Sequence, residues 1–271
     1  MSQETPPSQT MSAAEKRALL AKLLKQKQTK QQAAKPPQRF ALTPAQKRLW
    51  FIEQLQPGNT AYNMPFAIRL RGDIDHQFLE ESLNGLIARH EILRTSFISD
   101  EGQPWQQAQP TLTITLPKTD LNVAANINDN ELQQHLLSPL QKIVSQPFKL
   151  NTPPLIRATL FTLGDRDYVL AIVMHHIIMD FTSLDIMTRD ILSLYQSKRQ
   201  QAALPLPELS IQYADYAHWL SQQQAQHQQQ TTYWCKQLAG APELLSLPTD
   251  FRRPARQRFI GDRVNFELEQ K

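Results

Sequence analysis

Two adjacent histidines, His175 and His176, follow a short apolar segment, and Asp180 lies four residues beyond the second histidine. Histidine is the side chain whose ordinary pKa suits proton transfer near neutral pH. The preceding residues 168–174 (YVLAIVM) are continuously apolar and rich in β-branched types, which predicts a buried strand. Because successive side chains of a strand point to opposite faces, we expect one histidine to face the interior and the other an opening.

Other chemistries have less support in the residues. His176 and Asp180 have the i, i+4 spacing of metal ligands on a helix, but no third ligand follows at a matching spacing. The seven glycines form neither the nucleophile elbow of a serine hydrolase nor a phosphate-binding loop. Core histidines that bond only to the backbone are the structural alternative. The residues alone therefore leave proton transfer and a structural role open.

The elements that must position the histidines follow from periodicity and capping. Residues 155–163 and 168–174 flank a turn at residues 164–167 (GDRD), which predicts a β-hairpin. Residues 182–185 (TSLD) resemble a capping box, and the apolar stripe after them predicts a helix that ends near Gln200. The histidines should therefore lie between a strand and a helix.

Further elements are predicted on both sides of this unit from the same signals. Upstream, helices are expected from Thr43 to Leu55 and at residues 75–90 and 130–145, and strands at 66–70, 93–98, near Trp105 and at 111–116. Downstream, we expect a helix with Tyr213 and Trp219, a polar stretch at 222–230, an amphipathic piece near Trp234, an irregular segment at 248–258 and a strand at 264–268.

Length and composition indicate a globular protein. The 271 residues, 41% of them hydrophobic, are enough for the core of one large domain or two small ones. We expect no membrane span and a cytoplasmic location, because no apolar run approaches the roughly 20 residues of a spanning helix and the N-terminus lacks the features of a signal peptide. The single cysteine, Cys235, is expected to be half-buried and unreactive.

The net charge of +4 is concentrated in the N-terminal tail. Residues 1–39 contain eight basic and two acidic residues, so the remainder has 21 basic and 23 acidic residues, a net −2. A mildly acidic body argues against a core that binds nucleic acid. Within the tail, residues 12–28 are expected to form a basic amphipathic helix that either docks on another polypeptide or packs on its own domain.

The histidine motif is accompanied by other characteristic segments. His175 to Asp180 resembles the H-H-x-x-x-D-G signature of the condensation-domain superfamily, the acyltransferases of nonribosomal peptide synthetases, which are related in fold to chloramphenicol acetyltransferase. Residues 42–50 (LTPAQKRLW) are similar to the family's S-x-A-Q-x-R-L-W segment, and residues 89–97 (RHEILRTSF) to its R-H-E-x-L-R-T-x-F segment. The resemblance extends in family order through residues 154–157, 212–217 and 247–250.

This resemblance implies an architecture. The fold class is α/β, a chloramphenicol-acetyltransferase-like α/β sandwich lobe with a mixed sheet, plus the start of a second lobe. We expect a disordered tail with the candidate docking helix at residues 1–38, the N-terminal lobe at 39–202, and a linker with the first elements of a truncated C-terminal lobe at 203–271. In the family the active site lies between two lobes, so half of its tunnel would be missing here.

The resemblance also implies a reaction. One carrier protein presents an acyl or peptidyl thioester on phosphopantetheine, another presents an aminoacyl thioester, and the free amine attacks the donor carbonyl to form an amide. The expected partners are these donor and acceptor carrier proteins and a candidate upstream synthase bound through residues 12–28. No bound cofactor, metal or nucleic acid is expected. The alternatives are a freestanding acyltransferase that forms esters and a non-catalytic carrier-protein or docking module.

Residue roles follow from the same resemblance. His176 is expected to act as the general base or to orient the amine, and His175 to face the interior. Asp180 is expected to hold the loop through an ion pair whose arginine comes from the second lobe, and the backbone amides that follow it could stabilise an oxyanion.

Three further residues carry expectations. Arg89 and Arg94 should brace the site, because guanidinium groups bridge carbonyls and carboxylates of neighbouring elements. The family's glycine after the aspartate is Phe181 here, and we expect its ring to form a hydrophobic wall of the channel.

Overall fold

The computed structural model describes residues 39–121, 128–202, 206–243, 246–255 and 266. Its elements in chain order are β1 (Arg39–Ala41), α2 (Pro44–Leu55), β2 (Asn63–Arg71), α3 (His76–Arg89), η1 (Glu91–Arg94), β3 (Thr95–Asp100), β4 (Gln103–Ala108), β5 (Lys118–Asp120), α4 (Asp129–Val144), β6 (Ile156–Gly164), β7 (Asp167–His175), α5 (Phe181–Gln200), α6 (Tyr213–Ser221) and α7 (Gln224–Gln237).

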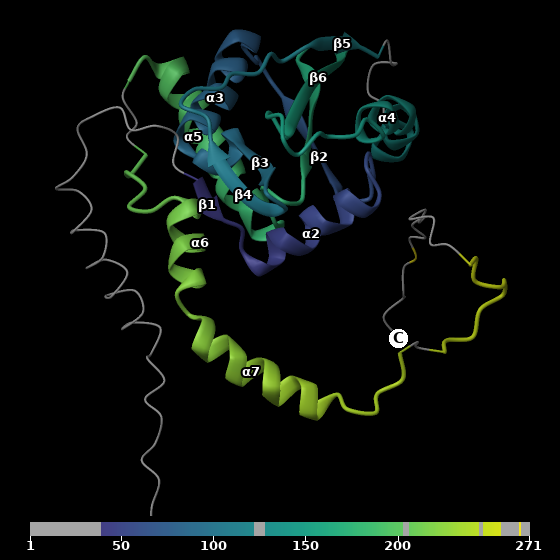
Figure 1. Ribbon diagram of the computed structural model, residues 1–271. Helices are drawn as coiled ribbons and strands as arrows, with labels where there is room; N and C mark the ends of the chain where they lie inside the picture. The colour runs from purple at the N-terminus through teal and green to yellow at the C-terminus, as the bar shows by residue number, and fades with distance from the viewer. Residues whose placement is uncertain (1–38, 122–127, 203–205, 244–245, 256–265, 267–271) are drawn as a thin grey trace, which may run out of the picture.

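A mixed four-stranded sheet in the order β2-β7-β6-β5 forms the centre of the molecule (Figure 1). The β6–β7 hairpin supplies its two inner strands, with Gly164 paired to Asp167 across the turn, and β5 runs parallel to β6. A second sheet, in the order β1-β4-β3, contains a hairpin in which β3 and β4, from the predicted strands at 93–98 and near Trp105, pair with Asp100 opposite Gln103. The expected α/β architecture with a mixed sheet is confirmed.

Helices cover both faces of the central sheet, which explains why β7 reads as one apolar run. Its even-numbered residues, such as Leu170 and Ile172, share a core with α3 and α5. Its odd-numbered residues Val169 and Ala171 share a second core with α4. A strand buried on both faces needs apolar residues at every position rather than at alternate ones.

The predicted strand at residues 111–116 is wrong, because this segment pairs with side chains of α3 instead of with a strand. The Asn84 side chain accepts from the Ile114 backbone N–H at 2.8 Å and donates to the Ile114 carbonyl oxygen at 2.9 Å. Glu80 accepts from the backbone N–H of Leu116 at 2.7 Å. These bonds satisfy the backbone in an extended segment outside either sheet. The strand predicted from residue 93 begins later, at Thr95, because residues 91–94 form the 3₁₀ turn η1.

Helix starts and the C-terminal segments differ in part from expectation. Thr43 caps α2 with Pro44 at the first helical position, as predicted. Helix α5, however, starts at Phe181 with Asp180 as its N-cap, so the predicted capping box at residues 182–185 is wrong.

Most of the polar stretch at residues 222–230, to which no secondary structure was assigned, belongs to α7. On that helix Cys235 is exposed, not half-buried. The predicted helix at 12–28 lies outside the described residues, as does nearly all of the predicted strand at 264–268.

Helix α6 packs against β1 and η1, although it follows the segment that we predicted to be an inter-lobe linker. Gln212, the residue before this helix, donates to the Arg89 carbonyl oxygen at 3.0 Å and accepts from the Glu91 backbone N–H at 3.0 Å. These two hydrogen bonds hold the start of α6 against the junction of α3 and η1. Among the described residues, no helix is long and apolar enough to span a bilayer.

Candidate active site

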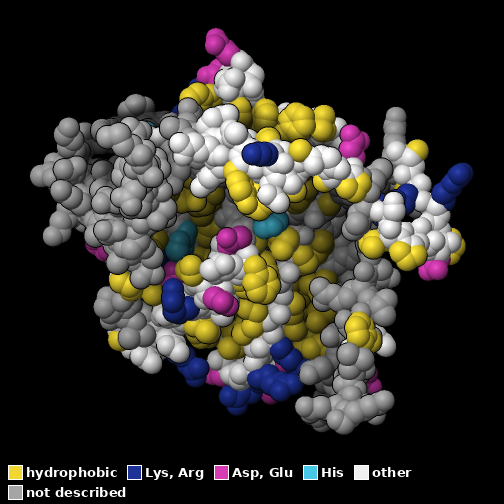
Figure 2. All heavy atoms as spheres, turned by 90° about the horizontal axis from the view of Figure 1, so that it is seen from below, with side chains coloured by type: hydrophobic (Ala, Val, Ile, Leu, Met, Phe, Trp, Pro, Cys, Tyr) yellow, Lys and Arg dark blue, Asp and Glu magenta, His cyan; other side chains and the backbone are white. Residues whose placement is uncertain are grey.

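A cavity of about 510 Å³ opens where β7 gives way to α5. Figure 2, seen from below, shows histidine and acidic side chains in a hollow among hydrophobic ones. The walls come from α2, the residue before β2, η1, the β7–α5 loop and the starts of α5 and α6. They are formed by Ala45, Gln46, Arg48, Leu49, Ile52, Tyr62, Ile92, His176, Ile177, Ile178, Met179, Asp180, Ser183 and Tyr213.

His175 lies in the interior, as the strand geometry predicted, and is only 2% exposed. Its ring lies between Tyr62 and Phe148, with centroid distances of 6.4 Å to each. Its Nδ1 accepts from the Ile177 backbone N–H at 3.1 Å, which places the proton of the neutral ring on Nε2. Burial, with a smaller contribution from the charge of His176, lowers the pKa of His175 to about 4. This ring is therefore neutral at physiological pH.

His176 faces the cavity and is held in one tautomer. Its Nδ1 lies 2.7 Å from the carbonyl oxygen of Met179. A carbonyl oxygen only accepts hydrogen bonds, so Nδ1 donates and the neutral ring keeps its lone pair on Nε2. Its backbone N–H donates to the Tyr62 carbonyl oxygen at 2.9 Å, which extends the β2–β7 pairing past the end of the strand. The arrangement suits a base that takes a proton through Nε2.

Asp180 caps the helix that follows the histidine loop. Its Oδ1 accepts from the Ser183 backbone N–H at 2.9 Å and from the Ser183 hydroxyl at 2.6 Å. These hydrogen bonds, the side-chain one foremost, lower the pKa of Asp180 against the opposing effect of burial. The carboxylate is exposed, and its expected ion pair with an arginine from a second lobe stays a prediction.

The histidine loop also rests on a buried amide pair. Gln46, buried at 2% exposure, lies with its Nε2 3.5 Å from the Ile177 carbonyl oxygen. Its Oε1 accepts from the backbone N–H of Thr43 at 3.0 Å and from the side chain of Gln106 at 3.2 Å. Helix α2 and strand β4 therefore support the loop from beneath.

Arg89 does not line the cavity but contacts α5, so its expected role in bracing the site stays a prediction. Its Nε donates to Oδ2 of Asp190 at 3.1 Å, and His90 lies 2.8 Å from the same oxygen. Asp190 is 2% exposed and lies on α5, three turns beyond Asp180. Arg89 also donates to the Pro207 carbonyl oxygen at 2.7 Å. The arginine thus joins α3, α5 and the segment that leads to α6.

Arg94 and Phe181 also lie apart from the cavity wall. Arg94 donates to the Gln109 carbonyl oxygen at 2.8 Å and holds the end of β4 against η1. Phe181, at the first position of α5, is 79% exposed and absent from the cavity lining. Its expected place in a channel wall depends on whatever covers this face, so that role stays a prediction.

Sequence reasoning missed Tyr213 and Asp190. Tyr213 is on the cavity wall, whereas the sequence placed it on a predicted helix and in the 212–217 family segment without giving it a role in the site. Asp190 falls on the apolar face of its helix, three residues after Met187 and four before Leu194. An acidic residue on an apolar helix face implies a buried cationic partner, and this signal could have found it.

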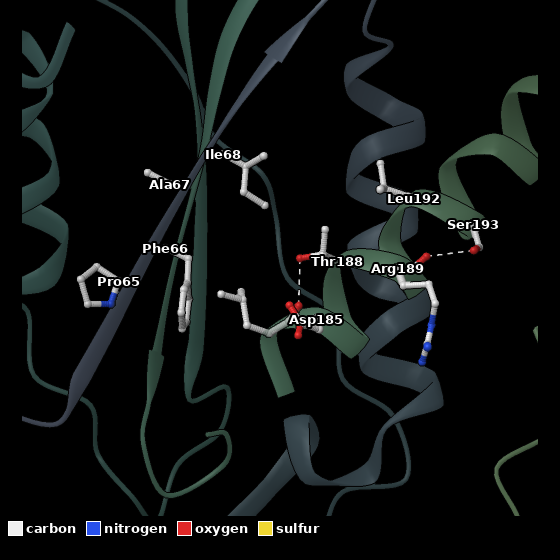
Figure 3. A pocket seen from close by; sticks show the side chains of 10 residues that line it. Pro65, Phe66, Ala67, Ile68, Asp185, Thr188, Arg189, Leu192 and Ser193 are labelled. Carbon is white, nitrogen blue, oxygen red and sulfur yellow. Dashed lines mark hydrogen bonds between the residues drawn. The ribbon is translucent and has the colours of Figure 1, made fainter. Parts of the chain in front are cut away.

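Within the described part of the chain, neither a cluster of metal ligands nor the groove beside α5 competes with this site. Among the residues that the structure describes, no three His, Cys, Asp or Glu side chains are grouped as metal ligands would be. A groove of about 700 Å³ lies between α5 and β2, with Phe66 and Ile68 on its strand wall and Leu192 on its helix wall (Figure 3). Asp185 and Arg189 are the ionisable side chains of that groove, so it lacks an imidazole base.

Comparison with known proteins gives matches along most of the chain. The condensation-domain family profile matches residues 37–271. Malpinin synthetase of Mortierella alpina is 42% identical over 224 residues, which are 81% of this chain and 3% of that protein. Bacitracin synthase 3 of Bacillus licheniformis is 36% identical over 232 residues, 85% of this chain and 3% of that protein.

Solved structures have the same fold. The X-domain from teicoplanin biosynthesis, solved in a complex with OxyB, is 30% identical with a TM-score of 0.69, over 82% of this chain and 48% of that one. The first condensation domain of the CDA synthetase is 24% identical with a TM-score of 0.67, over 78% and 53% of the two chains, and supports the fold alone. The chain thus spans about half of these solved structures and a small part of the curated relatives.

Proposed function

Because the chain belongs to the condensation-domain family, we propose that it supplies the histidine-bearing part of an acyltransferase that forms an amide bond between two carrier-bound substrates. The donor would be an acyl or peptidyl thioester and the acceptor an aminoacyl thioester, each on the phosphopantetheine arm of a carrier protein. Residues 12–28 would contact an upstream synthase. The observation that carries the proposal is the fixed tautomer of His176, whose Nε2 is left free at the cavity.

The geometry supports a simple sequence of proton and bond changes. The acceptor amine attacks the donor carbonyl carbon, and Nε2 of His176 takes the proton that the nitrogen loses as the C–N bond forms. The carbonyl oxygen carries negative charge until the C–S bond breaks. The imidazolium of His176 then returns its proton to the departing sulfur, so the pantetheine leaves as the thiol and the base is regenerated. The Met179 carbonyl oxygen, 2.7 Å from Nδ1, stabilises the imidazolium that results. Removing that partner would allow the other tautomer, which has no free lone pair on Nε2.

His176→Ala tests the proposal in a protein that contains this chain together with the rest of the family's domain. Amide formation between loaded carriers should fall at least about 100-fold, since general base catalysis contributes roughly 10²- to 10⁴-fold. His218→Ala, which changes an exposed histidine on α6, is the matched control and should retain full turnover. Unchanged turnover in His176→Ala would refute the assigned role.

Docking without catalysis is the second candidate function. One observation favours it: a solved neighbour at 30% identity is an X-domain whose structure was determined in complex with another protein, OxyB. In that case the intact protein would show no amide formation with any loaded carrier, and it would still bind a protein partner. The exposed Phe181 would then be a contact residue, and Phe181→Ala should weaken that binding.

A further inference from the structure

Where α6 contributes to the cavity wall, it supplies the phenolic hydroxyl of Tyr213. Tyr213 is the first residue of α6, and it lines the cavity together with His176 and Asp180. Its ring packs against Tyr216 at a centroid distance of 5.7 Å, and its Oη lies 3.2 Å from Oγ1 of Thr43. The hydroxyl therefore has one protein partner of its own type, and the direction of that hydrogen bond decides what Tyr213 can offer to a bound molecule.

The hydrogen bonds around Thr43 set this direction. Oε1 of Gln46 already accepts from the Thr43 backbone N–H at 3.0 Å and from the Gln106 side chain at 3.2 Å, which uses both of its lone pairs. The Thr43 hydroxyl can donate to that oxygen at 3.4 Å, or to the Tyr213 hydroxyl at the shorter distance of 3.2 Å. Thr43 Oγ1 in turn accepts from the Gln46 backbone N–H at 3.2 Å.

These contacts are best satisfied when Thr43 donates to Tyr213. The phenolic oxygen then acts as the acceptor, and its own hydrogen has no acceptor among the protein contacts that the structure shows for it. Because the ring lies on the cavity wall, that hydrogen is available to a molecule in the cavity.

The position of this hydroxyl is fixed before any substrate binds. The side-chain amide of Gln212 joins the start of α6 to both the Arg89 carbonyl oxygen and the Glu91 backbone N–H. Burial raises the pKa of Tyr213 against the opposing effect of the Thr43 hydrogen bond, and Tyr216 and Asp180 raise it further, so the phenol keeps its proton at neutral and mildly alkaline pH. A rigid, protonated donor in a partly enclosed site is the type of group that stabilises developing negative charge.

We propose that the Tyr213 hydroxyl donates a hydrogen bond to the thioester carbonyl oxygen of the donor substrate in the His176 cavity. The inference deepens the proposed function and rests on it. As the amine attacks, the carbonyl oxygen gains negative charge, and the hydrogen bond from Tyr213 strengthens while His176 takes the proton from the nitrogen. Tyr213 is then a catalytic residue on the side of the carbonyl oxygen, and His176 on the side of the nucleophile.

Tyr213→Phe tests this in the complete domain, because it removes the hydroxyl and keeps the ring that packs on Tyr216. With an acyl-pantetheine donor and an aminoacyl-pantetheine acceptor, kcat should fall roughly 100-fold while KM changes less than about threefold, as for loss of an oxyanion donor. Tyr216→Phe is the matched control, since Tyr216 lies on the same helix but is absent from the cavity lining, and it should match the wild type.

A second measurement does not depend on turnover. The infrared carbonyl band of a ¹³C-labelled acyl-pantetheine thioester should lie at lower frequency when bound to the wild type or to Tyr216→Phe than when bound to Tyr213→Phe. Equal bands in all three proteins would overturn the proposal. So would full turnover in Tyr213→Phe when His176→Ala is inactive, and that outcome would leave the proposed function intact. Absence of turnover in the wild type contradicts the proposed function, while the infrared band still decides whether Tyr213 contacts the carbonyl.

Discussion

Lowering the pH from about 7.5 to about 5 should destabilise the chain through one buried residue, His175. Its pKa is about 4 in the folded chain, because burial and the neighbouring His176 disfavour the charged ring, against an ordinary value of 6.5. The unfolded chain therefore binds a proton at this residue more readily than the folded chain. Stability is fully present above the unfolded pKa and is lost as the pH falls from about 6.5 toward 4.

The size of the effect follows from the shift. At about 1.4 kcal/mol per pKa unit, the whole difference corresponds to about 3 kcal/mol. At a pH of about 5 the unfolded imidazole is almost fully protonated and the folded one is mostly neutral, so about 2 kcal/mol of the free energy of unfolding is lost. This is a large share of the roughly 5–15 kcal/mol that stabilises a typical domain.

Urea unfolding followed by tryptophan fluorescence at the two pH values measures this loss. His175→Asn is the matched variant, because the asparagine Oδ1 can accept the Ile177 N–H that Nδ1 of the histidine accepts, and it does not titrate. The wild type should lose about 2 kcal/mol more than the variant on acidification, while contributions from the carboxylates cancel in the comparison. Equal losses in the two proteins would show that the reasoning about His175 is wrong.

Three further outcomes are expected. Asp190→Ala should lower the free energy of unfolding, measured by urea titration, by about 3–5 kcal/mol, because it leaves the partly buried guanidinium of Arg89 without its carboxylate. A loss below about 1 kcal/mol would contradict a structural role for the pair. Asp180→Ala should cost about 1 kcal/mol through the lost N-cap, and Asp180→Ser, which can still cap, should cost less. Phe181→Gly should change the melting temperature of the chain by no more than a few degrees, because the ring is 79% exposed and packs little. If the native protein lacks peptide-forming activity and this variant restores it, the expected channel-wall role is wrong.

The placement of the two histidines could be predicted from the sequence because it depends on local rules. A continuous apolar run set the strand, and the alternation of side chains put one ring inside and one at the opening. The tautomer of His176 could not be predicted in this way. It depends on where the carbonyl group of Met179 points in the turn after β7, and no residue type encodes that direction.

Predictions of secondary structure from the sequence were wrong where two capping patterns lay close together, and where side chains from another element bonded to the backbone. Both Asp180 and Thr182 are good N-cap residues with a polar residue three positions later, and the structure uses the first pair. The 111–116 segment has the alternation of a strand, but Asn84 and Glu80 of α3 take its backbone hydrogen bonds. The polar stretch near residue 225 received no assignment because it has no apolar periodicity; glutamine is nevertheless a good helix former, and the stretch belongs to helix α7.

The extension of backbone pairing beyond β7 has a consequence for motion at the site. The His175 N–H donates to Leu155 and the His176 N–H to Tyr62, so the two residues are tied to the flanking segments on both sides of the central strand. Their amide protons should exchange with solvent as slowly as those of the sheet core, through opening of the whole sheet rather than of a loop. We therefore expect the backbone of His176 to keep its position during substrate binding and product release. Movements of the carrier proteins and of the segments that cover the cavity should take place relative to this residue.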